Sequence, residues 1–217
     1  MAFGYNPFIA KWSPYHGAEY AIIEAISKVV AAGARYNNMR FSYQEFFERM
    51  NSEHSWGKPL AALLGALKMQ TEFGLPSIGG KDSMSGTFND SLSVPPMLMA
   101  FGITTVNAKN VISPDFKSRG HKLYLVKHTE NADYTPNVEQ LKENFEFVSH
   151  NIEKGKIVSA YALGFGGLVE ALAKCSFGNQ TGFYVKYDEN ELDRFNYGSI
   201  LIEVSGSLDY PKDCEPM

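Results

Sequence analysis

The sequence has 217 residues and a mass of 24.2 kDa, with 44% hydrophobic and 20% charged residues, which is an ordinary composition for a globular protein. Twenty basic residues against 24 acidic ones give a net charge of −4, and no basic tract stands out. Nucleic acid is therefore not expected as a partner. The longest apolar stretch, residues 18–33, contains Glu19, Glu24 and Lys28, so no membrane span is expected.

The N-terminal residues and the cysteines argue against further classes of protein. The first residues lack a basic segment followed by an apolar core, which argues against a secretory signal. Two cysteines, Cys175 and Cys214, cannot build a disulfide framework or a zinc site. We therefore expect a cytoplasmic, globular α/β protein.

The first half of the chain predicts two helices and two strands. A helix should start at Pro14, with Ile22, Ile26 and Val29 on its apolar face, and no strand is expected before it. A second helix is expected between residues 56 and 74, with four leucines as its apolar stripe. Two strands are expected in this half, one over 39–47 and one over 96–106 that is buried on both faces.

The second half alternates strands and helices after a polar segment that resembles a linker. Such mixing predicts an α/β or α+β sandwich. The expected strands are residues 122–127, 156–162, 181–187 and 199–204, and the expected helices are 138–152 and 166–177.

The segment 79–86, GGKDSMSG, carries the most chemistry. It is predicted to be a loop, because paired glycines let backbone N–H groups approach an anion. Lys81 adds positive charge, Ser83 and Ser85 add hydroxyl groups, and Asp82 supplies a hard oxygen ligand suited to Mg²⁺. These residues fit a phosphate–magnesium cradle, and they fit equally a polar turn between buried elements. The order of a Walker A loop is absent.

Glu24 is the second candidate, because it lies within an otherwise apolar helix. A carboxylate there is paired, exposed or bound to a metal. Lys28 follows four residues later in the order that favours an ion pair, so both interpretations stay open. The glycine-rich start of a helix at residues 164–167 can receive a phosphate or form a tight strand-to-helix turn.

The remaining reactive residue types form no recognisable site. Five histidines are scattered without ligand spacing and are expected at the surface or at helix caps. Cys175 lies among alanine and leucine and is expected in the core. No serine or cysteine has a nearby histidine signature, so covalent catalysis has no support.

Residues 75–85, LPSIGGKDSMS, resemble phosphoribosylformylglycinamidine synthase, and GGKDSMSG is typical of the second synthase-like half of that enzyme family. The resemblance includes residues 4–7, 40–47, 56–59 and 160–167 and thus most of the chain. It implies an internal fragment with an aminoimidazole-ribonucleotide-synthetase-like (PurM-like) fold of α/β (α+β) class.

The implied organisation is a partial N-terminal subdomain at 1–108, a linker at 109–120 and a partial C-terminal subdomain at 121–217. The implied parent is a ligase of purine biosynthesis. Formylglycinamide ribonucleotide, glutamine and ATP give formylglycinamidine ribonucleotide, glutamate, ADP and phosphate. Mg²⁺ neutralises phosphate charge in this chemistry.

The resemblance also implies which half this is and what it binds. One half is catalytic, and the other keeps a nucleotide–magnesium site with a mainly structural role. This chain resembles the second kind, so no catalytic residue is expected and the fragment alone should be inactive. The implied magnesium ligands are Glu24 and Asp82, and the implied ATP or ADP contacts are Gly79, Gly80, Lys81, Ser83 and Ser85.

Two departures from the family pattern support an alternative. Lys28 replaces an asparagine ligand, and residues 162–167 lack the histidine and aspartates usual before the paired glycines. The alternative is therefore a decayed scaffold that binds no ligand and packs against the catalytic half.

The expected partners are a nucleotide, the catalytic synthase half and the glutaminase domain. An exposed strand edge could also let the fragment form a homodimer.

Overall fold

The computed structural model describes residues 1–186, 188, 192, 194, 196–208 and 214–216, the last three by their backbone alone. The chain forms two compact units built from interleaved segments. Unit 1 is Met1–Ile26, Asn37–Thr104 and Glu130–Pro136, and unit 2 is Ser27–Tyr36, Thr105–Thr129 and Asn137–Met217. The sequence analysis expected two subdomains with continuous bounds, and those bounds stay a prediction.

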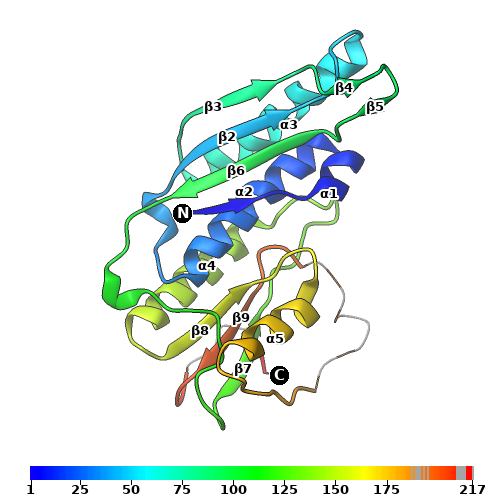
Figure 1. The fold of residues 1–217 in the computed structure, drawn as a ribbon. Helices are drawn as coiled ribbons and strands as arrows, with labels where there is room; N and C mark the ends of the chain where they lie inside the picture. Colours follow the sequence, from blue (N-terminus) through cyan, green and yellow to red (C-terminus); the bar gives the residue numbers. More distant parts are fainter. Residues whose placement is uncertain (187, 189–191, 193, 195, 209–213, 217) are drawn as a thin grey trace. The chain divides into compact units, whose positions relative to one another are not determined.

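Unit 1 is built on a four-stranded sheet with helices on one face (Figure 1). The strand order is β1 (Ala2–Gly4), β6 (Met97–Ile103), β2 (Arg40–Phe46) and β3 (Ser77–Ser83), and the helices are α1 (Pro7–Trp12), α2 (Pro14–Ala31) and α3 (Glu53–Phe73). Strand β2 pairs antiparallel with β6 and parallel with β3. A small hairpin, β4 (Thr87–Phe88) and β5 (Leu92–Ser93), follows β3.

The helix predicted from Pro14 is confirmed as α2, but the absence of a strand before it is wrong. β1 and α1 come first, and the Asn6 side chain caps α1 by accepting the N–H of Phe8 at 2.8 Å. Strand β6 is not buried on both faces as expected. Its residues alternate between buried and half-buried, as a sheet covered by helices on one side requires.

The second predicted helix is confirmed as α3, but the face that it buries is not the predicted one. Gly74, at φ +67°, ends it as predicted, whereas its start at Glu53, capped by Ser52, lies three residues before the expected bound at residue 56. Its buried face, however, carries small residues such as Ala62 and Ala66. The predicted stripe is 45–59% exposed and consists of Leu60, Leu63, Leu64 and Leu67. The face predicted to be buried therefore lies at the surface of unit 1.

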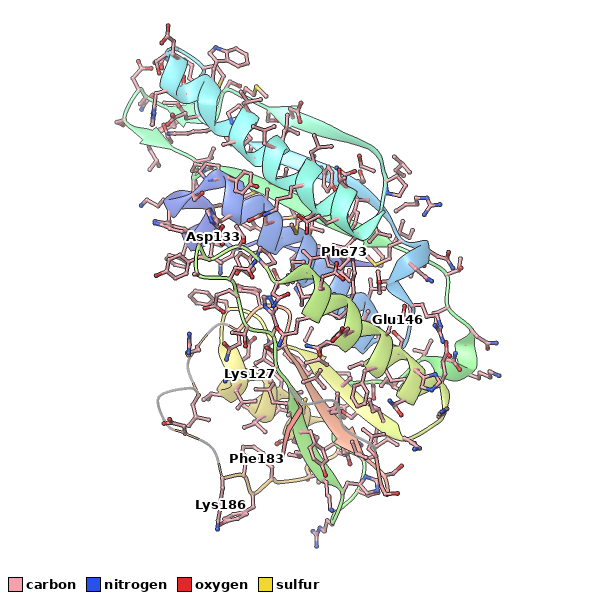
Figure 2. All side chains as sticks on the ribbon, turned by 180° about the vertical axis from the view of Figure 1, so that it is seen from behind. Phe73, Lys127, Asp133, Glu146, Phe183 and Lys186 are labelled. Atoms are coloured by element: carbon pink, nitrogen blue, oxygen red, sulfur yellow. The ribbon has the colours of Figure 1, made fainter. Side chains whose placement is uncertain are left out.

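Unit 2 contains a second sheet, antiparallel throughout, with one helix on each face (Figures 1 and 2). The order is β10 (Cys214–Pro216), β7 (Lys122–Val126), β9 (Ile200–Val204) and β8 (Ile157–Ala162), with helices α4 (Val138–Glu153) and α5 (Gly167–Phe177). All five residues of β9 are buried, because both faces of this central strand are covered. Short 3₁₀ turns occupy Tyr36–Asn38 and Ala108–Asn110.

Most predicted elements of the second half are confirmed. The exception is the strand expected over 181–187: residues 181–186 form no strand, and Tyr187 lies outside the described residues. Cys175 is in the core as predicted, packed in a cluster with Leu168 and Leu201. Across the described part of the chain, no helix is long and apolar enough to cross a membrane.

Candidate functional site

The GGKDSMSG segment is a strand for most of its length, so the predicted loop is wrong up to Ser83. Strand β3 lies at the edge of the sheet and is paired in parallel with β2. Gly80 lies opposite Tyr43, and Asp82 lies opposite Glu45. The carboxyl ends of parallel strands are the edge where open α/β sheets commonly bind ligands.

The two glycines have a structural reason in this strand. Gly79 has φ +152°, within the range that favours glycine, and it follows a register shift in the pairing with β2. A Cβ atom on Gly80 would lie 2.6 Å from the carbonyl oxygen of Tyr43. Strand pairing therefore accounts for the paired glycines, without a bound phosphate.

The polar side chains of β3 divide between the two faces of the sheet, because successive residues of a strand point in opposite directions. Lys81 and Ser83 share one face, where the ammonium donates to the Ser83 hydroxyl and lies 5.6 Å from the ring centre of Phe46. Asp82 lies on the other face, beside Glu45. The predicted metal ligand and the predicted phosphate ligands of this strand thus face different ways.

Glu45 is a buried carboxyl group that the sequence analysis did not single out. It is 1% exposed, and its Oε1 atom has no hydrogen-bond partner. Burial raises its pKa to about 8, and the neighbouring Asp82 acts in the same direction. A hard cation within reach of Oε1 would satisfy that oxygen. The alternation of Phe41, Tyr43 and Glu45 is the signal that marks Glu45 as core-facing.

Glu24, the other predicted ligand, has a structural partner. It lies on α2, is 7% exposed, and its Oε2 atom accepts the N–H of Tyr5 at 2.8 Å. Within the described ranges, no group of three or more histidine, cysteine, aspartate or glutamate side chains is arranged to hold a metal. A magnesium ion at Asp82 would therefore need hydroxyl, carbonyl or water oxygens in addition to the carboxylates.

Ser85 lies beyond the strand and lines a cavity of about 510 Å³ at the β4–β5 hairpin. Gly86 also lines it, and its N–H donates to the carbonyl of Phe47 at 2.9 Å, which fixes the exit of the chain from β3. The cavity volume lies within the range typical of small-ligand sites. Ser85 is thus placed beside a space large enough for part of a nucleotide.

The glycine-rich start of α5 is a tight turn. The N–H of Gly166 donates to Oε2 of Glu170 at 2.9 Å, and the N–H of Gly167 donates to the carbonyl of Gly164 at 3.0 Å. A carboxylate of the chain itself thus occupies a position where a phosphate would bind. This supports the turn interpretation.

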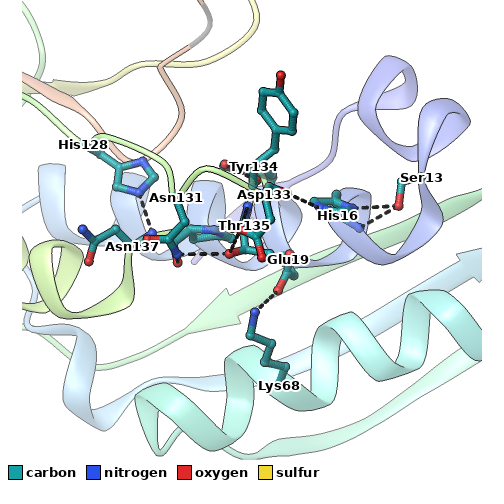
Figure 3. Close-up of polar contacts among 12 residues, drawn as sticks. Ser13, His16, Glu19, Lys68, His128, Asn131, Asp133, Tyr134, Thr135 and Asn137 are labelled. Atoms are coloured by element: carbon teal, nitrogen blue, oxygen red, sulfur yellow. Dashed lines mark hydrogen bonds and ion pairs between the residues drawn. The ribbon is translucent and has the colours of Figure 1, made fainter.

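A third buried carboxylate, Glu19 of α2, faces Lys68 of α3 (Figure 3). Glu19 is 0% exposed, and the Lys68 ammonium lies 3.0 Å from its Oε1 atom. Burial raises the pKa of Glu19, while Lys68 lowers it. At the start of the same helix, the Ser13 hydroxyl accepts the backbone N–H of His16 at 3.4 Å and lies 2.8 Å from Nδ1 of the His16 ring, so Ser13 caps α2 and His16 lies at the cap.

His128 departs from the expectation of surface or capping histidines, because it is 2% exposed. Its Nδ1 lies 2.7 Å from the Tyr197 carbonyl, and its Nε2 lies 3.1 Å from the backbone nitrogen of Asn137, the N-cap of α4. The carbonyl requires a donor and the N–H an acceptor, so the ring is the neutral Nδ1–H tautomer. His128 is a structural core residue.

Comparison with known proteins agrees with the resemblance seen in the sequence. Over 93% of its own length, the chain is 26% identical to phosphoribosylformylglycinamidine synthase subunit PurL of Picrophilus torridus. It is also 26% identical to PurL of Thermococcus sibiricus over 85% of its length. The resemblance to phosphoribosylformylglycinamidine synthase is confirmed. The chain spans 29% and 28% of these two relatives. No family model matches the sequence.

Solved structures confirm the fold. PurL of Thermotoga maritima complexed with ATP aligns with a TM-score of 0.69 at 16% identity, covering 94% of this chain and 35% of that one. The same enzyme complexed with FGAR gives a TM-score of 0.69. The HypE–HypF complex aligns at 0.63 and 14% identity, covering 92% of this chain and 76% of that one. The aminoimidazole-ribonucleotide-synthetase-like fold predicted from the sequence is therefore shown.

Proposed function

We propose that this chain is the nucleotide–magnesium-binding, non-catalytic synthase-like half of an ATP-dependent, glutamine-using phosphoribosylformylglycinamidine synthase. The observation that carries the proposal is the carboxyl pair of Glu45 and Asp82 on parallel strands, with one buried oxygen lacking a partner. Support comes from the PurL relatives and from the T. maritima PurL structures complexed with ATP and ADP.

We place the proposed magnesium ion at β3. Asp82, with Glu45 beside it, offers the hard oxygen ligands that Mg²⁺ prefers. Bound there, Mg²⁺ would neutralise phosphate charge. We retain Glu24 of α2 as a proposed ligand, although one of its oxygens already accepts the Tyr5 N–H and no group of three carboxylates is formed among the described residues.

The nucleotide contacts are proposed around the same strand. The hydroxyl of Ser85 lines the hairpin cavity, and the backbone of Gly79 and Gly80 lies at the open edge of the sheet. Lys81 and Ser83 already bond each other on the opposite face from Asp82, so contact with a phosphate requires their side chains to separate. The remaining domains of the parent, catalytic and glutaminase, are the proposed protein partners.

Calorimetric titration with ADP, with and without Mg²⁺, tests this proposal. Binding should require Mg²⁺ and weaken at least tenfold, about 1.4 kcal/mol, in Asp82→Ala. Glu72→Ala is the matched control, since it removes an exposed carboxylate of α3 in the same unit. Equal ADP affinity in Asp82→Ala and in the unchanged chain would contradict the proposal.

A scaffold without ligand is the second candidate. The observation that favours it is the exposed leucine face of α3, which is large for a surface helix and suits a packing partner. It predicts that the folded chain binds no ADP at any Mg²⁺ concentration. Self-association of the isolated chain through the β3 edge, a homodimer, would appear as a concentration-dependent mass in sedimentation.

A further inference from the structure

Unit 2 contains a second cavity, of about 510 Å³, beside the first residues of β7. It is lined by the cationic residues Arg119 and Lys122, by His121, and by the aromatic residues Phe183 and Tyr184. All its lining residues belong to unit 2, so the cavity is independent of the β3 site. Neither the resemblance nor the compared proteins' names assign anything to it.

A buried carboxylate fixes the cationic turn in place. Glu203, in the central strand β9, is 1% exposed. Its Oε2 accepts the N–H of Lys117 at 2.7 Å, and its Oε1 accepts the N–H of Ser118 at 3.1 Å. Oε1 also lies 2.7 Å from Nδ1 of His121. The turn before β7 is thus held to the sheet at three points, and the imidazole has Nε2 left for a ligand.

The charge at the cavity is complementary to an anion. Glu203 is the single acidic residue among the described lining residues, and its carboxylate is already occupied by three donors. Arg119 and Lys122 are exposed cations, and neither has a described ion-pair partner. Ser118 and Thr181 also line the cavity, and the Thr181 hydroxyl donates to the carbonyl of Asn179 at 3.3 Å. Arginine and lysine together are the usual means of holding a phosphate group.

The aromatic wall indicates what the anion is attached to. Tyr184 is 82% exposed and Phe183 is 45% exposed, on the segment after α5, where Figure 2 shows Phe183 at the outside of the unit. Phe183 is held edge-on by Phe116, with ring centres 6.4 Å apart. Water-exposed rings beside a cationic turn suit stacking of a planar ring together with charge recognition.

We propose that this cavity of unit 2 binds a planar aromatic ring that carries a phosphate group, of which a nucleoside monophosphate is the simplest example. The phosphate lies at Arg119, Lys122 and His121, and the ring stacks on Tyr184. The volume lies within the range of small-ligand sites.

The test is a titration of the full chain with AMP in the absence of Mg²⁺. Binding is measured by calorimetry and by the NMR proton resonances of the histidine rings. The signal of His121, assigned by its loss in His121→Gln, should shift saturably. Arg119→Ala and Lys122→Ala should each weaken AMP binding by about tenfold, or about 1.4 kcal/mol. Both residues are exposed, so these variants should fold. Lys154→Ala, an exposed lysine at the end of α4, is the matched control and should bind AMP normally.

Two further measurements separate the parts of the ligand. Inorganic phosphate should bind more weakly than AMP, and Tyr184→Ala should weaken AMP while leaving phosphate unaffected. Asp82→Ala should leave AMP binding in the unit 2 cavity unchanged. Failure of the nucleotide–magnesium proposal at β3 would therefore not decide the proposal for this cavity. The proposal is wrong if millimolar AMP leaves the His121 signal in place, or if Arg119→Ala and Lys122→Ala bind AMP as the unchanged chain does.

Discussion

Glu45 and Asp82 lie opposite each other on the parallel strands β2 and β3, and Glu45 is almost completely buried. Its pKa is raised from 4.5 to about 8 in the folded chain, mainly by burial. In metal-free buffer the unfolded state therefore loses this proton at lower pH than the folded state does, and the folded state is destabilised as pH rises from 4.5 to about 8.

The variant Glu45→Gln should remove this contribution to the pH dependence. We expect its free energy of unfolding to exceed that of the unchanged chain near pH 8, with the difference shrinking by up to about 1.4 kcal/mol per pH unit on acidification. Urea unfolding at several pH values measures this. A difference between the two proteins that does not vary with pH would show that Glu45 titrates normally.

Breaking the pair of Glu19 and Lys68 should cost more than removing it whole. Lys68→Met leaves a carboxylate at 0% exposure without its cation and should lower the free energy of unfolding by about 3 kcal/mol at pH 7. The double variant Glu19→Gln/Lys68→Met should recover most of that loss. Chemical denaturation of the unchanged chain, of the single variants Glu19→Gln and Lys68→Met and of the double variant gives the coupling energy. A loss below about 1 kcal/mol in Lys68→Met would show that the pair is solvated.

Two glycines of α3 form a matched test of helix packing. A Cβ atom on Gly65 would lie 2.2 Å from the carbonyl oxygen of Tyr15, whereas one on Gly57 would meet nothing within 4 Å. Gly65→Ala should therefore destabilise unit 1 by about 2 kcal/mol or more, since the helices must separate. Gly57→Ala should stabilise it by about 0.5–1 kcal/mol through the helix propensity of alanine. Equal thermal shifts would contradict this packing of α3.

Cys175 should be unreactive in the folded protein. It is 1% exposed, and burial raises the pKa of its thiol to about 12, so almost no thiolate forms at pH 8. In a Cys214→Ser background, an aromatic disulfide reagent should titrate no thiol in native buffer and one thiol in denaturant. Rapid reaction in native buffer would show that the α5 core opens.

The sequence predicted the fold well where a local signal and the packing agree. The α2 start, the C-terminal end of α3 and the helices α4 and α5 follow from caps and periodicity. The prediction of which face of α3 is buried was wrong, because its leucine stripe and its small-residue face have similar periodicity. Periodicity alone does not say which face another element approaches closely enough to require small residues.

The candidate site was predicted less completely, because strand pairing is not visible in a single segment. GGKDS is typical of a loop by composition, yet pairing with β2 makes it a strand and places Asp82 beside Glu45. Glu203 was missed in a similar way, since a carboxylate in an otherwise apolar strand gains its three donors from a turn more than 80 residues away. Glu45 and Glu203 each stand at a buried position where the neighbouring buried positions of the strand carry apolar or aromatic residues, and that departure is the local signal available.

The central claim is that a nucleotide and its metal bind at β3 of unit 1. Manganese relaxation measures this most directly, because Mn²⁺ substitutes for Mg²⁺ and broadens nearby amide resonances. With Mn²⁺ and ADP, the amides of residues 79–85 and of Glu45 should broaden strongly, and Asp82→Ala should abolish the effect. Broadening confined to residues outside β2, β3 and the hairpin, or none in a folded chain, would contradict the account and favour the scaffold.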